Sequence, residues 1–110
     1  MANIFKNRVK GPVSTNQLTV YTVPTNTVTT VIGVNVANII SDNIYVDVEI
    51  TDSSLSVTKY LVKGAVIPAG SSAVLVGGNQ KVVLEEGDSL KVTSNQTNSA
   101  DVIVSVLEIS

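Results

Sequence analysis

Residues 43–51 read Asn-Ile-Tyr-Val-Asp-Val-Glu-Ile-Thr, and this stretch decides the fold class. Its apolar residues alternate with Tyr, Asp, Glu and Thr, and they are Ile44, Val46, Val48 and Ile50. A period of two places the apolar side chains on one face of a β-strand and the other side chains on the opposite face. The stretch therefore predicts a strand with one face in a core and one face in water.

The composition extends this prediction along the chain. Val (21), Ile (9) and Thr (11) together make up 41 of the 110 residues. Branched side chains restrict χ1 and suit a pleated sheet, so a chain this rich in them favours strands over helices. Apolar runs separated by Gly, Pro, Asn, Asp and Ser predict about eight short strands, at residues 18–23, 28–37, 43–51, 56–63, 72–76, 80–85, 89–94 and 100–109.

Strands at this spacing predict an all-β fold, with one antiparallel β-sandwich domain at residues 18–110. The pattern leaves the immunoglobulin-like type and the jelly-roll type open, because the order of the strands is not visible in one sequence. Residues 64–70 contain Pro68 and predict a loop that crosses between strands, and the Gly-Gly-Asn at residues 77–79 predicts a hairpin turn.

The residue types argue against most catalytic and metal chemistry. The chain has no His and no Cys, so it offers no imidazole base, no thiolate nucleophile and no ordinary zinc, haem or iron–sulfur ligands. Carboxylates gather around one predicted strand at Asp42, Asp47, Glu49 and Asp52, but they lack the spacing of a calcium loop and are interpreted as solubilising groups. We therefore expect a protein that is not an enzyme and that uses no cofactor or metal.

The N-terminal segment differs in charge from the rest of the chain. Residues 1–41 carry three basic side chains and no acid, whereas residues 42–110 carry four basic and nine acidic ones. We predict that residues 1–17 form a basic docking arm outside the domain, with a disordered terminus as the alternative. Three charges without aromatic platforms predict no nucleic-acid binding, and no apolar run is long enough to predict a membrane span. The predicted docking residues are Ile4, Phe5, Lys6 and Arg8.

The last predicted strand is apolar on both faces. One face carries Val102, Val104 and Val106, and the other carries Ile103, Leu107 and Ile109. A strand of a small sandwich normally shows one face to water, so a second apolar face indicates either a covered central strand or burial against another subunit. The mean hydropathy of +0.34 favours the second reading. We therefore predict a homo-oligomer with Ile103, Leu107 and Ile109 at the subunit interface, and with the opposite valine face as the alternative.

Several segments carry a family resemblance. They are Met-Ala-Asn-Ile-Phe-Lys-Asn at 1–7, Thr-Val-Tyr-Thr-Val-Pro at 19–24, Ile-Pro-Ala-Gly-Ser-Ser at 67–72, Leu-Glu-Glu-Gly-Asp-Ser-Leu-Lys-Val at 84–92 and Asp-Val-Ile-Val-Ser-Val-Leu-Glu at 101–108. In these segments the chain resembles small virion structural proteins of tailed bacteriophages, notably those of marine cyanophages.

The resemblance implies a non-enzymatic protein located in the virion, of the capsid decoration or cement type. Its partners would be other virion proteins, with the major capsid protein first among them. Two alternatives remain open at this point. One is a tail or baseplate accessory protein, and the other is a glycan-binding module for attachment to the host.

Overall fold

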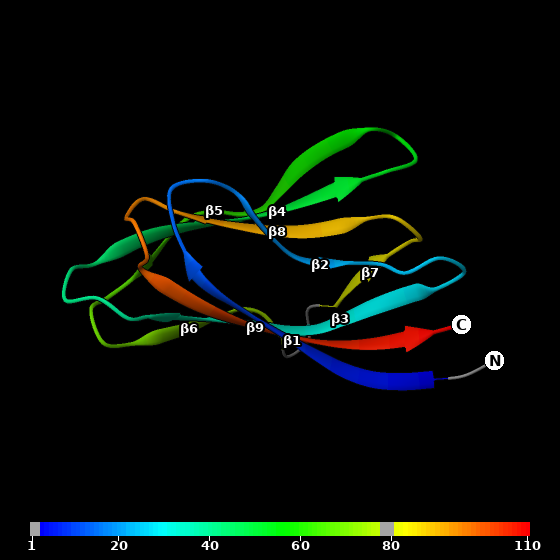
Figure 1. Ribbon diagram of the computed structural model, residues 1–110, viewed down its shortest axis with the longest axis horizontal. Helices are drawn as coiled ribbons and strands as arrows, with labels where there is room; N and C mark the ends of the chain where they lie inside the picture. Colours follow the sequence, from blue (N-terminus) through cyan, green and yellow to red (C-terminus); the bar gives the residue numbers. More distant parts are fainter. Residues whose placement is uncertain (1–2, 78–80) are drawn as a thin grey trace.

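The computed structural model describes residues 3–77 and 81–110, which form nine strands in two antiparallel sheets (Figure 1). The predicted all-β sandwich is confirmed. Within the described residues there is no helix, and so none long and apolar enough to cross a membrane. The strands are β1 (Asn3–Val13), β2 (Leu18–Thr22), β3 (Val28–Asn38), β4 (Ile44–Asp52), β5 (Val57–Ile67), β6 (Ser72–Val76), β7 (Val82–Leu84), β8 (Ser89–Ser94) and β9 (Ala100–Ile109).

The strand order distinguishes between the two predicted sandwich types. The five-stranded sheet has the order β1-β9-β3-β6, and β7 also pairs with β3; the four-stranded sheet has the order β2-β8-β4-β5. β6 pairs with the later half of β3 and β7 with its earlier half, so together they form one interrupted edge strand. With β6 and β7 counted as one, the sheet orders become 1-8-3-6 and 2-7-4-5. This is the jelly-roll arrangement.

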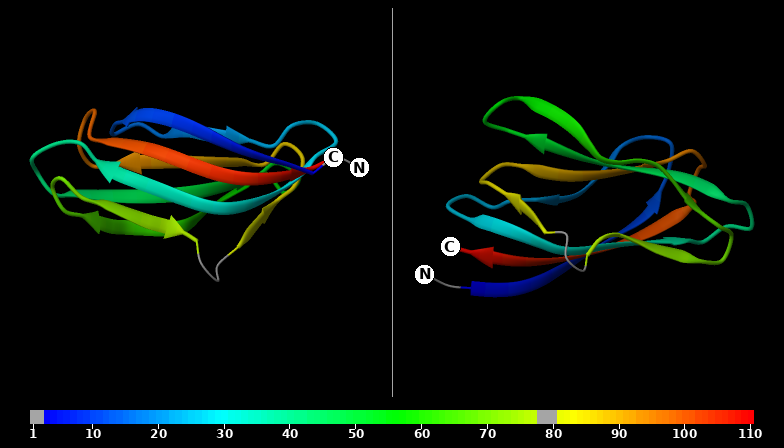
Figure 2. Two further views of the ribbon diagram at one scale, coloured as in Figure 1. Left: turned by 90° about the horizontal axis from the view of Figure 1, so that it is seen from below. Right: turned by 180° about the vertical axis from the view of Figure 1, so that it is seen from behind.

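The N-terminal segment belongs to the sandwich, so the prediction of a separate arm at residues 1–17 is corrected. β1 pairs along β9 from Asn3 opposite Ile109 to Lys10 opposite Val102 (Figures 1 and 2). After a cis peptide bond before Pro12, β1 ends at a fully buried Val13. The physical reason is that β9 pairs with β3 on one side only, so without β1 the backbone N–H and C=O groups along its other side would have no partner strand.

Most other strand boundaries agree with the prediction to within two residues, and β5 is the main exception. The predicted crossing loop at residues 64–70 is wrong for its first part, because β5 continues through Gly64 to a fully buried Ile67. Gly64 has a positive φ of 69°, and its N–H donates to the Asp47 carboxylate at 2.8 Å, which carries the strand past an irregularity. The predicted turn at 77–79 lies largely outside the described residues.

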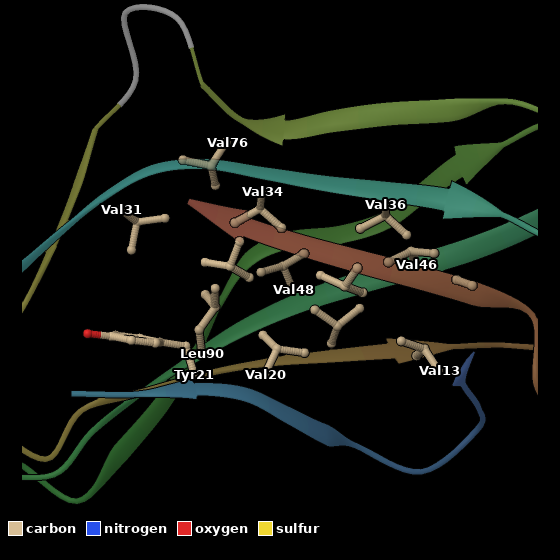
Figure 3. Packing of buried hydrophobic residues seen from close by; sticks show 14 of the residues in the cluster. Val13, Val20, Tyr21, Val31, Val34, Val36, Val46, Val48, Val76 and Leu90 are labelled. Atoms are coloured by element: carbon tan, nitrogen blue, oxygen red, sulfur yellow. The ribbon is translucent and has the colours of Figure 1, made fainter. Parts of the chain in front are cut away.

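The core lies between the inner faces of the two sheets and consists mainly of valine (Figure 3). The valine face of the last strand is the inner one, a choice that the sequence left open, since Val102, Val104 and Val106 are fully buried. Alternation likewise puts Ile44, Val46 and Val48 of β4 into this core. The outer faces of both sheets are therefore the surfaces on which a functional site can lie.

Candidate protein-binding face

Register places two rows of side chains across the outer face of the five-stranded sheet. Residues directly opposite one another on paired strands point to the same face. The first row consists of Phe5, Leu107, Thr30 and Val83, and the second consists of Val9, Ile103, Asn35 and Val74. Ile109 and Val28 form the end of a third row beyond the first. Figure 2 (left) shows the strands that carry these rows lying side by side.

This outer face gathers most of its exposed apolar side chains into one area. We call it the apolar face and define it by Phe5, Val9, Val28, Val74, Val83, Ile103, Leu107 and Ile109. Six of these side chains are exposed by 45% or more, and they are Phe5 (75%), Val74 (70%), Val9 (63%), Val83 (63%), Val28 (45%) and Ile103 (45%). They expose on the order of 500 Å², within the range of about 300–600 Å² for the largest apolar patch on a typical monomer.

Charged side chains are nearly absent from the apolar face. Among the described strand residues that point to it, Asp101 is the only charged one, and it lies at one end beside Gly11. The remaining polar groups are the neutral side chains of Asn3, Asn7, Thr30, Asn35, Ser72 and Ser105. A solvated outer sheet face usually carries charges against edge-to-edge and face-to-face association, so this one is suited to contact with protein.

A hollow separates the two apolar rows. It has a volume of about 360 Å³, and its lining includes Phe5, Asn7, Ile32 and Ser105. Ser105 lies opposite Asn7 on one side and Gly33 on the other, so this row of small and polar residues is lower than the rows beside it. The apolar face thus has a ridge, a hollow and a second ridge along the strand direction.

The structure brings together residues that the sequence assigned to two different sites. Phe5, predicted for partner docking, lies opposite Leu107, predicted for the subunit interface. Ile103 and Ile109 share the same outer face. Ile4, Lys6 and Arg8 are excluded from it, because they alternate with Phe5 and point to the inner side of β1. Their predicted role in docking beside Phe5 is therefore not supported by the arrangement.

Lys6 instead takes part in a buried polar network under the edge of the sheet. Its Nζ lies 2.8 Å from Oε1 of Glu108, whose side chain is almost fully buried. The Tyr21 hydroxyl donates to the other oxygen of Glu108 at 2.5 Å and lies 2.8 Å from the Thr29 hydroxyl. The network joins β1, β2, β3 and β9, and it fixes the first apolar row from beneath.

The network shifts the pKa values of both titrating partners. The hydrogen bond from Lys6, and then that from Tyr21, holds the pKa of the Glu108 carboxyl below its ordinary value of 4.5. Burial, together with the hydrogen bond to Glu108, raises the pKa of the Tyr21 hydroxyl to about 12. Glu108 is therefore ionised and Tyr21 protonated at neutral pH, which is the state that satisfies both groups.

A second apolar surface lies near the tip of the β4–β5 hairpin, which stands away from the other strands (Figures 1 and 2). It is a groove of about 430 Å³ lined by Ile50, Asp52, Leu55, Val57, Lys59, Tyr60 and Leu61. Unlike the apolar face, it carries charges of both signs in its lining. It also involves only one hairpin, so we regard the apolar face as the stronger candidate.

The carboxylates considered in the sequence do not converge. Asp47 accepts hydrogen bonds from Lys63 and from the Gly64 N–H, and Glu49 accepts one from Gln17. Asp52, at the end of β4, instead lies near Glu85 and Asp88, which belong to the turn between β7 and β8. The carboxylate oxygens of these three residues lie within 4.8 Å of one another. Asp88 is occupied as a turn anchor, because its two oxygens accept the N–H groups of Ser53 and Glu85 at 2.9 Å.

Asp88→Ala is expected to lower the free energy of unfolding by about 2 kcal/mol, because it leaves two backbone N–H groups without their charged acceptor. Urea unfolding of the variant and the parent protein measures the difference. If the cluster is structural, millimolar Ca²⁺ leaves the parent midpoint unchanged. A clear rise with Ca²⁺ that Asp88→Ala abolishes would instead mean that the cluster binds the ion.

A scan against models of known protein families finds no match, and a search of curated proteins finds none either.

Sequence reasoning missed part of the apolar face. It identified Phe5 and the outer side of β9, but not Val9, Val28, Val74 and Val83. Val28, Val74 and Val83 each alternate with a more buried neighbour, as Val83 does with Leu84, whereas Val9 lies between the exposed Arg8 and Lys10. A local signal was therefore present for the first three and absent for Val9. The strand order that places all four on one surface is not visible in the sequence.

Proposed function

We propose that the protein is a non-enzymatic structural component of a bacteriophage virion, of the capsid decoration or cement type, and that it acts by binding other virion subunits through the apolar face. The observation that carries this proposal is the gathering of six well-exposed apolar side chains, with one charged strand residue, on one outer sheet face. The location in a virion is supported by the sequence resemblance described above. The jelly-roll fold itself is neutral in this respect, because jelly rolls serve many functions.

The apolar face suits a lattice protein for a physical reason. A decoration protein that repeats over a particle gains avidity from many modest contacts, so it needs interface area more than it needs a deep pocket. A flat sheet face held by a valine core supplies such an area without ordering a loop on binding. A tail or baseplate accessory would use the face in the same way, and location on the particle distinguishes it.

The glycan-binding alternative receives less support. Sugar rings commonly stack on aromatic side chains, and the chain has no Trp. Tyr45 and Tyr60 are exposed, but the Lys63 ammonium already lies 4.7 Å from the centre of the Tyr60 ring.

Binding to particles tests the proposal. Virions of the phage that encodes the chain, purified without it, are mixed with the parent protein, with Val74→Lys and with Val66→Lys, and the bound fraction is measured after sedimentation. Val74 lies on the apolar face, whereas Val66 is exposed on the outer face of the other sheet, opposite Tyr45. We expect the parent protein and Val66→Lys to bind, and Val74→Lys to lose at least ten-fold in affinity.

Absence of the protein from purified parental virions would contradict the virion assignment. Equal binding of the two lysine variants would contradict the role of the apolar face. Immunogold labelling over the head rather than the tail distinguishes decoration of the capsid from a tail accessory.

A further inference from the structure

We infer that the apolar face is covered by a second copy of this chain, packed face to face about a two-fold axis that crosses the strands near Ser105. The inference rests on the proposed function only in its claim that the face binds protein. It concerns the free protein, in which a second copy covers the face until a virion subunit replaces it, and it adds the identity of that second copy and the geometry of the contact. Its support comes from the size, the charge and the relief of the face.

The size of the patch fits a dimer contact. Its apolar side chains expose on the order of 500 Å², and the neutral side chains among them add to that area. A standard interface buries about 800 Å² on each partner. The apolar side chains thus supply more than half of the area that a standard dimer contact buries on each partner, with the charge of Asp101 left at the rim.

The charge of the face favours a second copy over a charged partner surface. Two copies of one surface bring like charges together about a two-fold axis, which is costly where the surface is charged. On the apolar face the described strand residues present one charge only, Asp101, and it lies at one end. Lys6 contributes to the lining of the hollow, but its ammonium is paired with Glu108 of its own copy at 2.8 Å, and Arg8 points to the other side of β1. Self-association is thus free of the repulsion that would oppose it.

The relief of the face is self-complementary. Phe5 and Val9 are four residues apart on β1, so their rows lie about 13 Å apart, with the hollow between them. The two-fold axis lies between the two packed sheets, runs perpendicular to the strands, and passes midway between the Phe5 row and the Ser105 row. It places the Phe5 ridge of each copy over the Ser105 hollow of the other copy. Phe5 of each copy then enters the hollow beside Asn7 and Ser105 of the other copy. Packed sheets lie about 10 Å apart, which leaves room for such interdigitation.

Cysteine cross-linking tests the geometry cleanly, because the chain has no cysteine of its own. Ser105→Cys places one thiol near the predicted axis, and Val66→Cys places one on the far sheet. In the predicted dimer, two Val66 positions lie on opposite surfaces of a four-layer stack, about 30 Å apart. A short bis-maleimide should therefore link Ser105→Cys at least ten-fold faster than Val66→Cys, at a rate that does not depend on dilution while the dimer persists.

Adding Phe5→Lys to Ser105→Cys should reduce the rate of linking to that of Val66→Cys, because a charge then enters the hollow. Equal rates for the two single-cysteine proteins would overturn the inference, and so would a preference for Val66→Cys. If the copies fail to cross-link while Val74→Lys still loses particle binding, the partner is another virion protein and the proposed function stands. If they cross-link as predicted but the parent protein binds no virion, the inference stands and the proposed function fails.

Discussion

Val104→Asp should lower the free energy of unfolding by at least about 4 kcal/mol, because a fully buried carboxyl raises its pKa by about 3–5 units and each unit corresponds to about 1.36 kcal/mol. Val104 is fully buried on the inner face of β9, and the core around it offers mainly valine. A small domain has only about 5–15 kcal/mol of stability, so the variant is expected to be largely unfolded on mild heating. Circular dichroism against temperature measures the loss.

Ile103→Asp is the matched variant, one residue earlier on the same strand. Ile103 is 45% exposed on the apolar face, so its carboxylate stays in water in the monomer. We expect a folded protein with a cost of less than about 1 kcal/mol, the range usual for a surface strand position, and a loss of self-association. Similar destabilisation by the two substitutions would contradict the assignment of inner and outer faces on β9.

Glu108→Ala is expected to cost about 2–3 kcal/mol, since it leaves the Lys6 ammonium without its ion-pair partner and leaves the Tyr21 hydroxyl with only the Thr29 hydroxyl as a buried partner. Tyr21→Phe should cost less, about 1–2 kcal/mol, because Glu108 keeps its partner Lys6. Urea unfolding at neutral pH measures both values. A smaller loss for Glu108→Ala than for Tyr21→Phe would contradict the central role of Glu108 in the network.

The same network predicts a dependence of stability on acid. The folded pKa of Glu108 lies below its ordinary value of 4.5. Its contribution to the free energy of unfolding is therefore fully present above the unfolded pKa, and it is lost as the pH falls through the lower folded pKa. Glu108→Gln should be less stable than the parent protein at pH 7, and the difference should shrink as the pH falls below about 4.5. A difference that stays constant down to the lowest pH would contradict the ionised state of Glu108.

Most of the secondary structure could be predicted because alternation is a local signal. The period of two in β4 follows from side chains that are near neighbours in the sequence, and the core confirms it at Val46 and Val48. β5 could not be followed past Gly64 in this way. There the strand continues because the Asp47 carboxylate on the neighbouring strand accepts the Gly64 N–H, a contact between residues far apart in the chain.

The N-terminal strand was missed for a related reason. Lys6 and Arg8 gave β1 the composition of a solvated segment, while its pairing partner lies about a hundred residues later, as in Asn3 with Ile109. The inward-pointing side chain of Lys6 is stabilised by its ion pair with Glu108 on β9. A cation on the inner side of an edge strand cannot be distinguished by sequence from a cation on a free arm.

The candidate site could be predicted only at Phe5 and on the outer side of β9. The two apolar faces of residues 100–109 indicated that Ile103 and Leu107 needed a cover. The surface that completes them comes from β1, β3, β6 and β7, and it exists only through the jelly-roll order of the strands. Local patterns show which side chains share a strand face, whereas topology decides which strand faces adjoin.

Absolute mass by light scattering during size exclusion, at several concentrations, tests the central claim that the apolar face is a protein-binding surface in the free protein, where the expected partner is a second copy. The parent protein and Val66→Lys should elute with twice the mass of the 11.5 kDa chain, and Val74→Lys should elute with the mass of one chain. A parent protein that remains monomeric at every concentration, or a Val74→Lys variant that associates as well as Val66→Lys does, would contradict the account.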